Sequence, residues 1–404
     1  MRIGIITYYR VANFGANLQA ISTYRFLRQA GHTPIFIRYM SRQLFAEIDG
    51  SYGTNAQVKA HLDFVDGTIV DQTRTCFTAD DVNEAIRQNG IEALIIGSDA
   101  VLQHHPLRSR LHVKGRYLKR IAIDRVNDER RFPNLFWGYG ITPSMKKSLM
   151  SASSQSSAYQ YFSSELKQRM NEALQGFVYI SVRDAWTRQM LQAVTGRDFP
   201  LTPDPVFAFN QNAADLIPDR EYILKKYGLP EDYVLVSFVN VRLPDVVITR
   251  LKDLFKDHAP CVALPSPLGI RFKHSFDYEI PMPLCPADWY ALIKYSRGYI
   301  GNNMHPVVVA LHNGVPCFSV DNYSRYDFWG RPLDDGASKI EDILRQFHLE
   351  ANRVVPAKGN SEDLAETIYN RIMTFPKEEV VQHAAVMYEK YIDMMSSIMK
   401  ALSL

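Results

Sequence analysis

The first 40 residues of the chain constrain its fold more than any other segment. Residues 2–9 (RIGIITYY) form a continuous apolar run rich in β-branched side chains, which predicts a buried strand. Residues 18–30 carry apolar side chains at helical spacing, Gly31 follows as a helix terminator, and residues 33–39 predict a second strand. A strand, a helix and a strand in so short a stretch predict a βαβ unit and therefore a parallel sheet.

Similar patterns recur along the chain and predict an α/β fold with two Rossmann-like domains and a central cleft. The first domain is expected over residues 1–209 and the second over 210–376. Residues 377–404 have the pattern of a long amphipathic helix, which could pack back on the first domain. The strands expected after the first two lie at 92–97, 178–183, 233–239, 260–265, 298–301 and 315–320. Residues 40–78 and 104–162 are the least regular and are expected to form long loops.

Composition excludes several functional classes. The chain of 404 residues has 46 Lys and Arg against 43 Asp and Glu, and this small excess gives no reason to expect a nucleic-acid partner. Its four cysteines lie far apart, and no recognised metal-ligand spacing occurs, so we expect reduced thiols and no metal. Signal-peptide features and apolar runs of membrane length are lacking, so we expect a cytoplasmic protein that could contact the inner face of a membrane through a partner or a lipid-linked substrate.

Two polar segments follow predicted strands of the first domain, where ligands of such sheets bind. In Asn13-Phe14-Gly15-Ala16-Asn17, Gly15 would let backbone amides approach a ligand, and Asn13 would bind it or simply cap the helix. The segment is neither G-x-G-x-x-G nor a P-loop. In Gly97-Ser98-Asp99, the Asp99 carboxylate would either exchange a proton with a sugar hydroxyl or cap a helix, and Ser98 lies beside it.

Two further candidates contain a cation and a histidine. Arg183, at the end of a buried strand, needs an anionic partner, which is either a ligand or Asp184 or Asp204. In residues 298–320, the sequence predicts a helix that starts at Pro306 with His305 as its N-cap. The amides of Val307 and Val308 would then form an anion site, with His305 as acid, phosphate ligand or plain cap.

These segments, in this order, resemble the polysaccharide pyruvyl transferase family over about residues 1–345. The family motifs N-[YF]-G-A-x-L-Q-A, G-S-D-x-x-W, S-x-R-[DE] followed by D-P, and R-x-H-G followed by G-x-P correspond to segments starting at Asn13, Gly97, Ser181 and Asn303. The resemblance implies a GT-B-like pair of Rossmann-like domains, with the acceptor on the first and the donor phosphate on the second. It also implies that Asp99, Arg183 and His305 belong to the donor site.

Three positions depart from the family pattern. The motif arginine is Asn303, the glycine after the histidine is Pro306, and the tryptophan is Leu102. Losing a cation should weaken the binding of a multiply charged donor, unless another cation replaces it. The candidates for this replacement are Arg271, Lys273, Arg297, Arg325 and Arg331.

The resemblance implies transfer of a pyruvyl group from phosphoenolpyruvate to a sugar of a bacterial surface polysaccharide, with no cofactor. The acceptor could be lipid-linked, and the chain could form a homo-oligomer. His305 and Asp99 would be catalytic, while Arg183, Asn303, Val307, Val308, Asn13, Gly15 and Ser98 would bind substrate. Two alternatives stay open: a GT-B glycosyltransferase that uses a nucleotide sugar, and an inactive sugar-binding paralogue.

Overall fold

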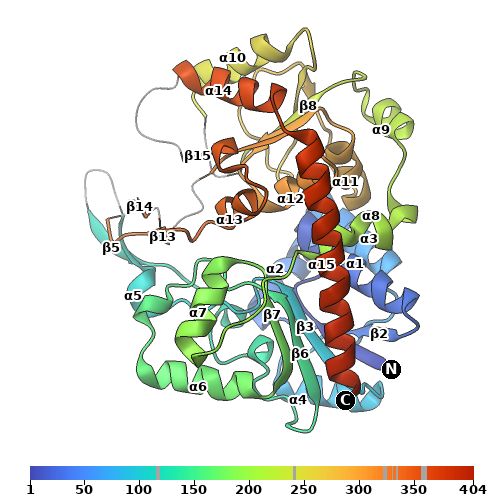
Figure 1. Ribbon diagram of the computed structural model, residues 1–404, viewed down its shortest axis with the longest axis vertical. Coiled ribbons are helices and arrows are strands. Elements are labelled where there is room, and N and C mark those ends of the chain that lie inside the picture. Colours follow the sequence, from blue (N-terminus) through green and yellow to red (C-terminus); the bar gives the residue numbers. More distant parts are fainter. Residues whose placement is uncertain (115–118, 240–242, 322–324, 330, 334, 356–361) are drawn as a thin grey trace.

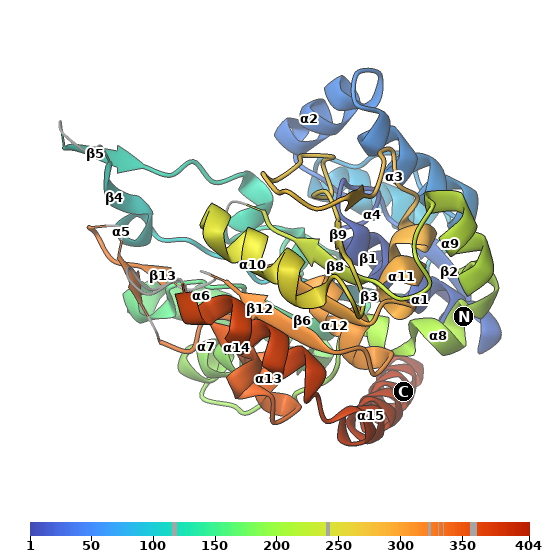
Figure 2. The ribbon, with the colours of Figure 1, turned by 90° about the horizontal axis from the view of Figure 1, so that it is seen from above.

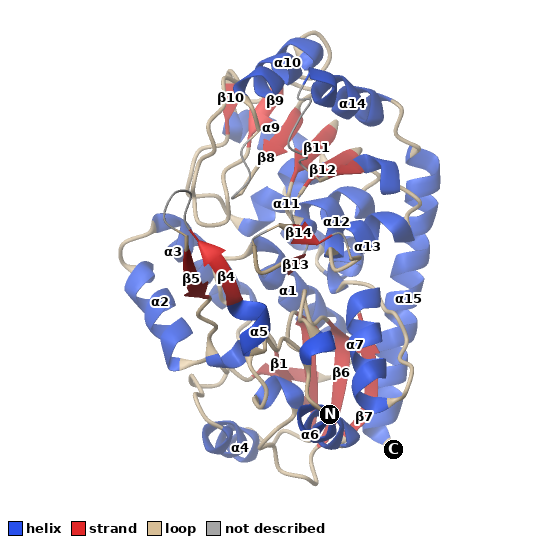
Figure 3. Ribbon diagram, turned by 90° about the vertical axis from the view of Figure 1, so that its left-hand side faces the viewer, coloured by secondary structure: helices blue, strands red, loops and turns tan. Residues whose placement is uncertain are grey.

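The computed structural model describes residues 1–114, 119–239, 243–321, 325–329, 331–333, 335–355 and 362–404. Two parallel sheets form the centres of two lobes, which we call the N-lobe and the C-lobe (Figures 1 and 3). Helices cover the sheets, so the fold is α/β with two Rossmann-like units, as the strand pattern predicts.

The N-lobe sheet has the order β2-β1-β3-β6-β7, and all its pairs are parallel. The chain therefore reverses its direction of growth between β1 and β3, which makes this pair the switch point of the sheet. Its strands are β1 (Arg2–Ile6), β2 (Thr33–Phe36), β3 (Ala93–Asp99), β6 (Lys146–Ala152) and β7 (Phe177–Val182).

The C-lobe sheet has the order β10-β9-β8-β11-β12-β15, also entirely parallel. Counted within the lobe, this is the order 3-2-1-4-5-6 of the Rossmann fold, with its switch point between β8 and β11. Its strands are β8 (Val234–Ser237), β9 (Cys261–Ala263), β10 (Tyr278–Glu279), β11 (Gly298–Gly301), β12 (Cys317–Val320) and β15 (Arg353–Val354).

The helices of the described residues flank these sheets or connect the lobes. They are α1 (Phe14–Gln29), α2 (Arg42–Tyr52), α3 (Ala56–Thr68), α4 (Ala79–Gln88), α5 (Leu107–Arg110), α6 (Ser164–Gln175), α7 (Ala185–Thr195), α8 (Phe209–Asn212), α9 (Arg220–Tyr227), α10 (Asp245–Phe255), α11 (Pro286–Lys294), α12 (Met304–His312), α13 (Lys339–Gln346), α14 (Glu362–Met373) and α15 (Lys377–Ser403). None of them combines the length and apolarity that a transmembrane span requires.

Two segments expected to be loops are regular instead. Residues 40–78 contain α2 and α3, which begin at the side-chain caps Ser41 and Asn55. Residues 104–162 contain β6, a strand inside the N-lobe sheet. Its sequence, KKSLMSA, does not predict a buried strand, because it contains the polar residues Lys147 and Ser148, which are nevertheless buried. The same region also forms a small antiparallel ribbon of β4 (Leu111–Lys114) and β5 (Arg120–Ile123).

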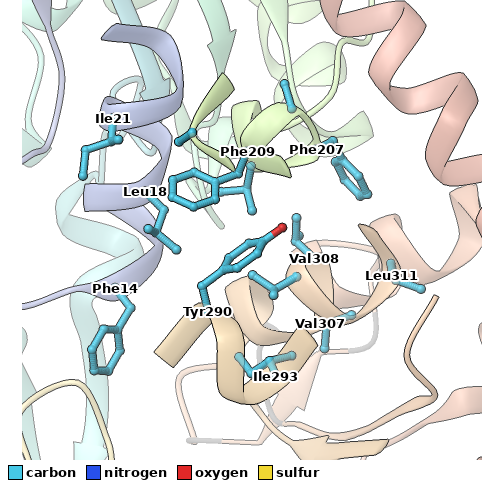
Figure 4. Close-up of a cluster of buried hydrophobic side chains, with 14 of the residues drawn as sticks. Phe14, Leu18, Ile21, Phe207, Phe209, Tyr290, Ile293, Val307, Val308 and Leu311 are labelled. Atoms are coloured by element: carbon cyan, nitrogen blue, oxygen red, sulfur yellow. The ribbon is translucent and has the colours of Figure 1, made fainter. Parts of the chain in front are cut away.

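The lobes share a continuous apolar core rather than a loose hinge. In Figure 4, Phe14 and Leu18 of α1 lie opposite Tyr290 of α11 and Val308 of α12. The Phe14 ring also stacks on that of Trp289 in the C-lobe, with ring centroids 4.8 Å apart. The helix α15 packs against α12 of the C-lobe and against β6 and β7 of the N-lobe, so it spans both lobes (Figure 1).

Candidate functional site

A cavity of about 680 Å³ opens between the lobes. Its walls include Gly15 and His305, which follow β1 and β11, and Asp99 and Ser237, which are the last residues of β3 and β8. These four strands flank the switch points of both sheets. Ligands of open α/β sheets bind at such points, so this cavity is the candidate site.

The start of α1, directly after the loop that follows β1, packs against the His305 side chain of the other lobe. Asn13 caps α1, because its side-chain oxygen accepts a hydrogen bond from the amide of Ala16 at 3.2 Å, and Asn13 also lines the cavity. A Cβ atom on Gly15 would lie only 1.9 Å from Cγ of His305. The His305 ring therefore rests directly on the Gly15 backbone, and only glycine leaves room for it.

His305 lies in the first turn of α12, close to polar groups of the N-lobe. Its Nε2 is 3.2 Å from Nε2 of Gln19 and 3.9 Å from Oδ2 of Asp204. The Gln19 amide also donates to Asp204, so its second proton can be donated to His305, and a neutral ring then carries its own proton on Nδ1. Burial lowers the pKa of His305, although Asp204 and Asp99 act in the opposite direction.

Arg183 is held by an internal ion pair, which was one of the alternatives for it. Its Nη1 donates to Oδ2 of Asp204 at 2.7 Å, and its Nη2 lies 3.7 Å from Oδ1 of Asp99. Its Nε and Nη2 are buried without a hydrogen bond. Arg183 lines a small crevice behind the large cavity, so we assign it to the electrostatics of the site and not to direct contact across the cavity wall.

Asp99 stays ionised in this setting. Burial raises the pKa of Asp99, but Arg183, Lys339 and His305 together outweigh burial and lower it. Its Oδ1 accepts a hydrogen bond from the amide of Ala100 at 2.7 Å, and Asp99 lines the cavity as predicted. A carboxylate so placed can accept a hydrogen bond from a substrate hydroxyl.

Lys339 is the cation that the sequence did not reveal. It is the first residue of α13, it lines both the cavity and the crevice, and the described residues give its ammonium group no hydrogen bond or ion pair. Burial, followed by the neighbouring Arg183, lowers the pKa of Lys339 to about 8, against the pull of Asp99. An unpaired cation in a cavity is suited to bind an anion, and only the topology brings α13 to this place.

The five cations expected to replace the family arginine lie elsewhere, so that prediction was wrong. None of them lines the cavity. Arg271 pairs with Glu279, Lys273 with Asp245, Arg297 with Asp232, Arg325 with Asp335, and Arg331 is exposed beside Asp327.

Three predicted binding residues also need correction. The helix α12 begins at Met304 with Asn303 as its N-cap, so the amides of Val307 and Val308 donate within the helix, and both side chains belong to the apolar core. The amides without an acceptor inside the helix belong to Met304 and His305, ahead of Pro306, and both residues line the cavity. Ser98 is buried, its hydroxyl donates to the carbonyl of Ser151 at 2.8 Å, and it does not line the cavity. Asn303 does line the cavity.

Within the described residues, no group of three or more His, Cys, Asp or Glu side chains is placed to hold a metal ion.

Comparisons with known proteins agree with this geometry. A family model described as polysaccharide pyruvyl transferase matches residues 13–324. A putative UDP-N-acetylglucosamine 2-epimerase from Listeria monocytogenes has a similar structure (TM-score 0.52, 12% identity, 95% of this chain and 90% of that chain covered). The UDP-GlcNAc 2-epimerase from Neisseria meningitidis bound to UDP-GlcNAc is similar with a TM-score of 0.52 and 8% identity, covering 99% of this chain and 100% of that chain. HepE from Anabaena in complex with UDP-glucose is similar with a TM-score of 0.52 and 10% identity, covering 100% of this chain and 99% of that chain. At these identities the likeness shows the fold alone, a GT-B-like arrangement of two lobes. No curated protein matches the sequence.

Proposed function

The chain belongs to the polysaccharide pyruvyl transferase family, and on that premise we propose that it transfers a pyruvyl group from phosphoenolpyruvate to a sugar of a bacterial cell-surface polysaccharide or of its lipid-linked precursor, forming a pyruvate ketal. The observation that carries the proposal is the Lys339 ammonium group, which has no ion-pair partner among the described residues and lies in one cavity with His305 and Asp99. A cation, a titratable ring and a carboxylate are the groups that this chemistry needs.

The donor carries a phosphate and a carboxylate, so its site needs positive charge. Lys339 supplies a full charge, and the first turns of α12 and α13 add amide groups and the positive ends of their helix dipoles. Asn303, at the position of the family arginine, contributes no charge, and Lys339 replaces that cation from another element. Arg183 lies behind these groups and keeps the carboxylate of Asp99 ionised.

The reaction requires one proton at the methylene carbon of the donor and the loss of two protons from the acceptor diol. Donor binding brings negative charge close to His305, raises its pKa and favours the protonated ring, which then donates to carbon. One sugar hydroxyl adds to the resulting cationic carbon, the C–O bond to phosphate breaks, and the second hydroxyl closes the ketal. Asp99 accepts a hydrogen bond from the attacking hydroxyl. One hydroxyl proton restores the acid, and the other leaves on hydrogen phosphate, so protons and charge balance.

Incubation with phosphoenolpyruvate and a panel of synthetic and lipid-linked glycans tests the proposal. The expected result is that one glycan gains the mass of pyruvic acid less one water molecule, with one phosphate released for each ketal. Binding and transfer from a nucleotide sugar, with no phosphate released from phosphoenolpyruvate, would refute it.

That second outcome would identify a GT-B glycosyltransferase. Two observations favour this candidate: structures with similar folds are described as complexes with UDP-GlcNAc and UDP-glucose, and a cavity of about 680 Å³ has room for a ligand larger than phosphoenolpyruvate. Glycan binding without turnover of either donor would instead identify an inactive paralogue, which the exchange of the motif arginine for Asn303 motivates.

A further inference from the structure

The ribbon of β4 and β5 has one apolar face. Its strands pair Leu111 with Ile123 and Val113 with Ile121. Because directly paired residues point to the same face and side chains alternate along a strand, these four side chains share a face, while Lys114 and Arg120 form a pair on the other. Ile121 is 66% exposed and Ile123 is 53% exposed. An isolated two-stranded ribbon is marginally stable in water, so this face calls for a partner.

Further exposed apolar side chains continue this surface. Leu107 of α5 precedes the ribbon, and Phe328 and Trp329 lie beside it, because the amide of Val113 donates to the carbonyl of Phe328 at 2.8 Å. The ammonium group of Lys119 lies 5.7 Å from the centroid of the Trp329 ring. We call this set, together with the apolar ribbon face, the ribbon surface.

The segment that carries the ribbon surface is also strongly cationic. Between residues 107 and 125, the described basic residues outnumber the single acid, Asp124, by six to one. They are Arg108, Arg110, Lys114, Lys119, Arg120 and Arg125, and a seventh basic residue of the run, Arg116, lies outside the described residues. The ribbon projects from the N-lobe on the side away from α15 (Figures 1 and 2), so a broad, flat partner can approach it.

We propose that the ribbon surface docks the protein on an anionic lipid bilayer. The isoleucine and tryptophan side chains would be buried at the boundary between headgroups and acyl chains, while Lys119, which lies against Trp329, and Arg125, which follows the ribbon, bind the headgroups. A solvated polyanion such as nucleic acid would leave the apolar side chains exposed. A second copy of the chain, joined through the same surface, would bring two sets of cations together.

This docking would place the cavity at the membrane. The segments that lead into and out of the ribbon line the cavity through Gln103 before it and Asn127 after it. A saccharide held on a lipid could therefore enter the cavity without leaving the bilayer. The docking does not depend on the reaction proposed above.

Sedimentation of the full chain with lipid vesicles tests the inference. The wild type should pellet with vesicles of phosphatidylcholine and phosphatidylglycerol, should remain in solution with phosphatidylcholine alone, and should be released by salt. Lys119→Glu with Arg125→Glu should lower the partition coefficient at least roughly thirtyfold. Ile121→Ser with Ile123→Ser should lower it roughly tenfold or more.

Matched variants change the same chemistry on other surfaces. Lys225→Glu with Lys256→Glu alters the net charge equally, and Val178→Ser with Val246→Ser removes exposed apolar side chains; both pairs should bind vesicles as the wild type does. Equal loss in the matched variants, equal binding to neutral vesicles, or no binding at all would overturn the inference. A dimer that the ribbon variants abolish, without vesicle binding, would assign the surface to a second copy instead. Ketal formation on a water-soluble glycan should be unchanged in all four variants, so failure of docking and failure of the proposed reaction are distinguishable.

Discussion

Replacing Lys339 by methionine tests the centre of the proposed donor site. The substitution removes the charge and keeps a long, unbranched side chain. A charge-assisted hydrogen bond contributes about 1.5–3 kcal/mol, so we expect the KM for phosphoenolpyruvate to rise roughly 10- to 150-fold. A Coulomb energy of about 4 kcal/mol for charges 4 Å apart near a protein surface sets the upper limit. Initial rates of phosphate release at varied donor concentration measure this effect.

The same variant should be more stable than the wild type. Lowering the pKa of Lys339 from 10.5 to about 8 corresponds to a cost of about 3 kcal/mol for the charged lysine in the folded protein. The folded-state pKa lies below the unfolded one, so the unfolded state binds more protons between pH 8 and 10.5, and wild-type stability should rise across that range. Below pH 8 the full cost is present, and there the methionine variant should melt at a higher temperature.

The Lys339→Arg variant is the matched control. The donor KM of the wild type should rise as the pH passes about 8, because Lys339 loses its charge, whereas the arginine variant stays charged and should keep a flatter profile. An unchanged donor KM in the methionine variant, or identical pH profiles for lysine and arginine, would refute the role given to Lys339.

Three other substitutions probe the groups around it. Gly15→Ala would place a Cβ 1.9 Å from Cγ of His305, so both the melting temperature and kcat should fall, and wild-type kinetics would contradict the contact between the lobes. His305→Ala should lower kcat about 10²- to 10⁴-fold, while phosphoenolpyruvate still raises the melting temperature; near-normal turnover would remove the ring from the mechanism. Asp204→Asn leaves Arg183 buried without its charged partner and should cost about 3–5 kcal/mol in the free energy of unfolding, measured with denaturant; a loss too small to measure would show that the pair is dispensable.

Most strands of the two large sheets were predictable because their signals are local. The apolar run at β1 and the helix terminator Gly31, which has a φ of +80°, predict the first βαβ unit from neighbouring residues alone. Polar residues at the carboxyl ends of β3 in one sheet and β11 in the other are expected to face the cleft between the lobes, and Asp99 and His305 line the same cavity.

The predictions that were wrong concern features decided by contacts between distant residues, or a helix that begins a few residues from its predicted start. The strand β6 carries polar side chains whose burial is decided by neighbouring strands, so its pattern resembles that of a loop. The start of α12 was misplaced by two residues, and this moved the free amides from Val307 and Val308 to Met304 and His305. Lys339 follows the segment that matches the family, and no local pattern distinguishes it from other lysines.

The contact of His305 with the opposite lobe means that the proposed acid is oriented by the packing of the two lobes. The ring belongs to the C-lobe, but the N-lobe residues Gly15 and Gln19 fix its orientation. Because the continuous apolar core holds the two lobes together, this orientation is in place before a substrate enters the cavity. Donor binding therefore need not align the acid, and loosening the packing of Phe14 on Trp289 should lower kcat without removing any group from the cavity.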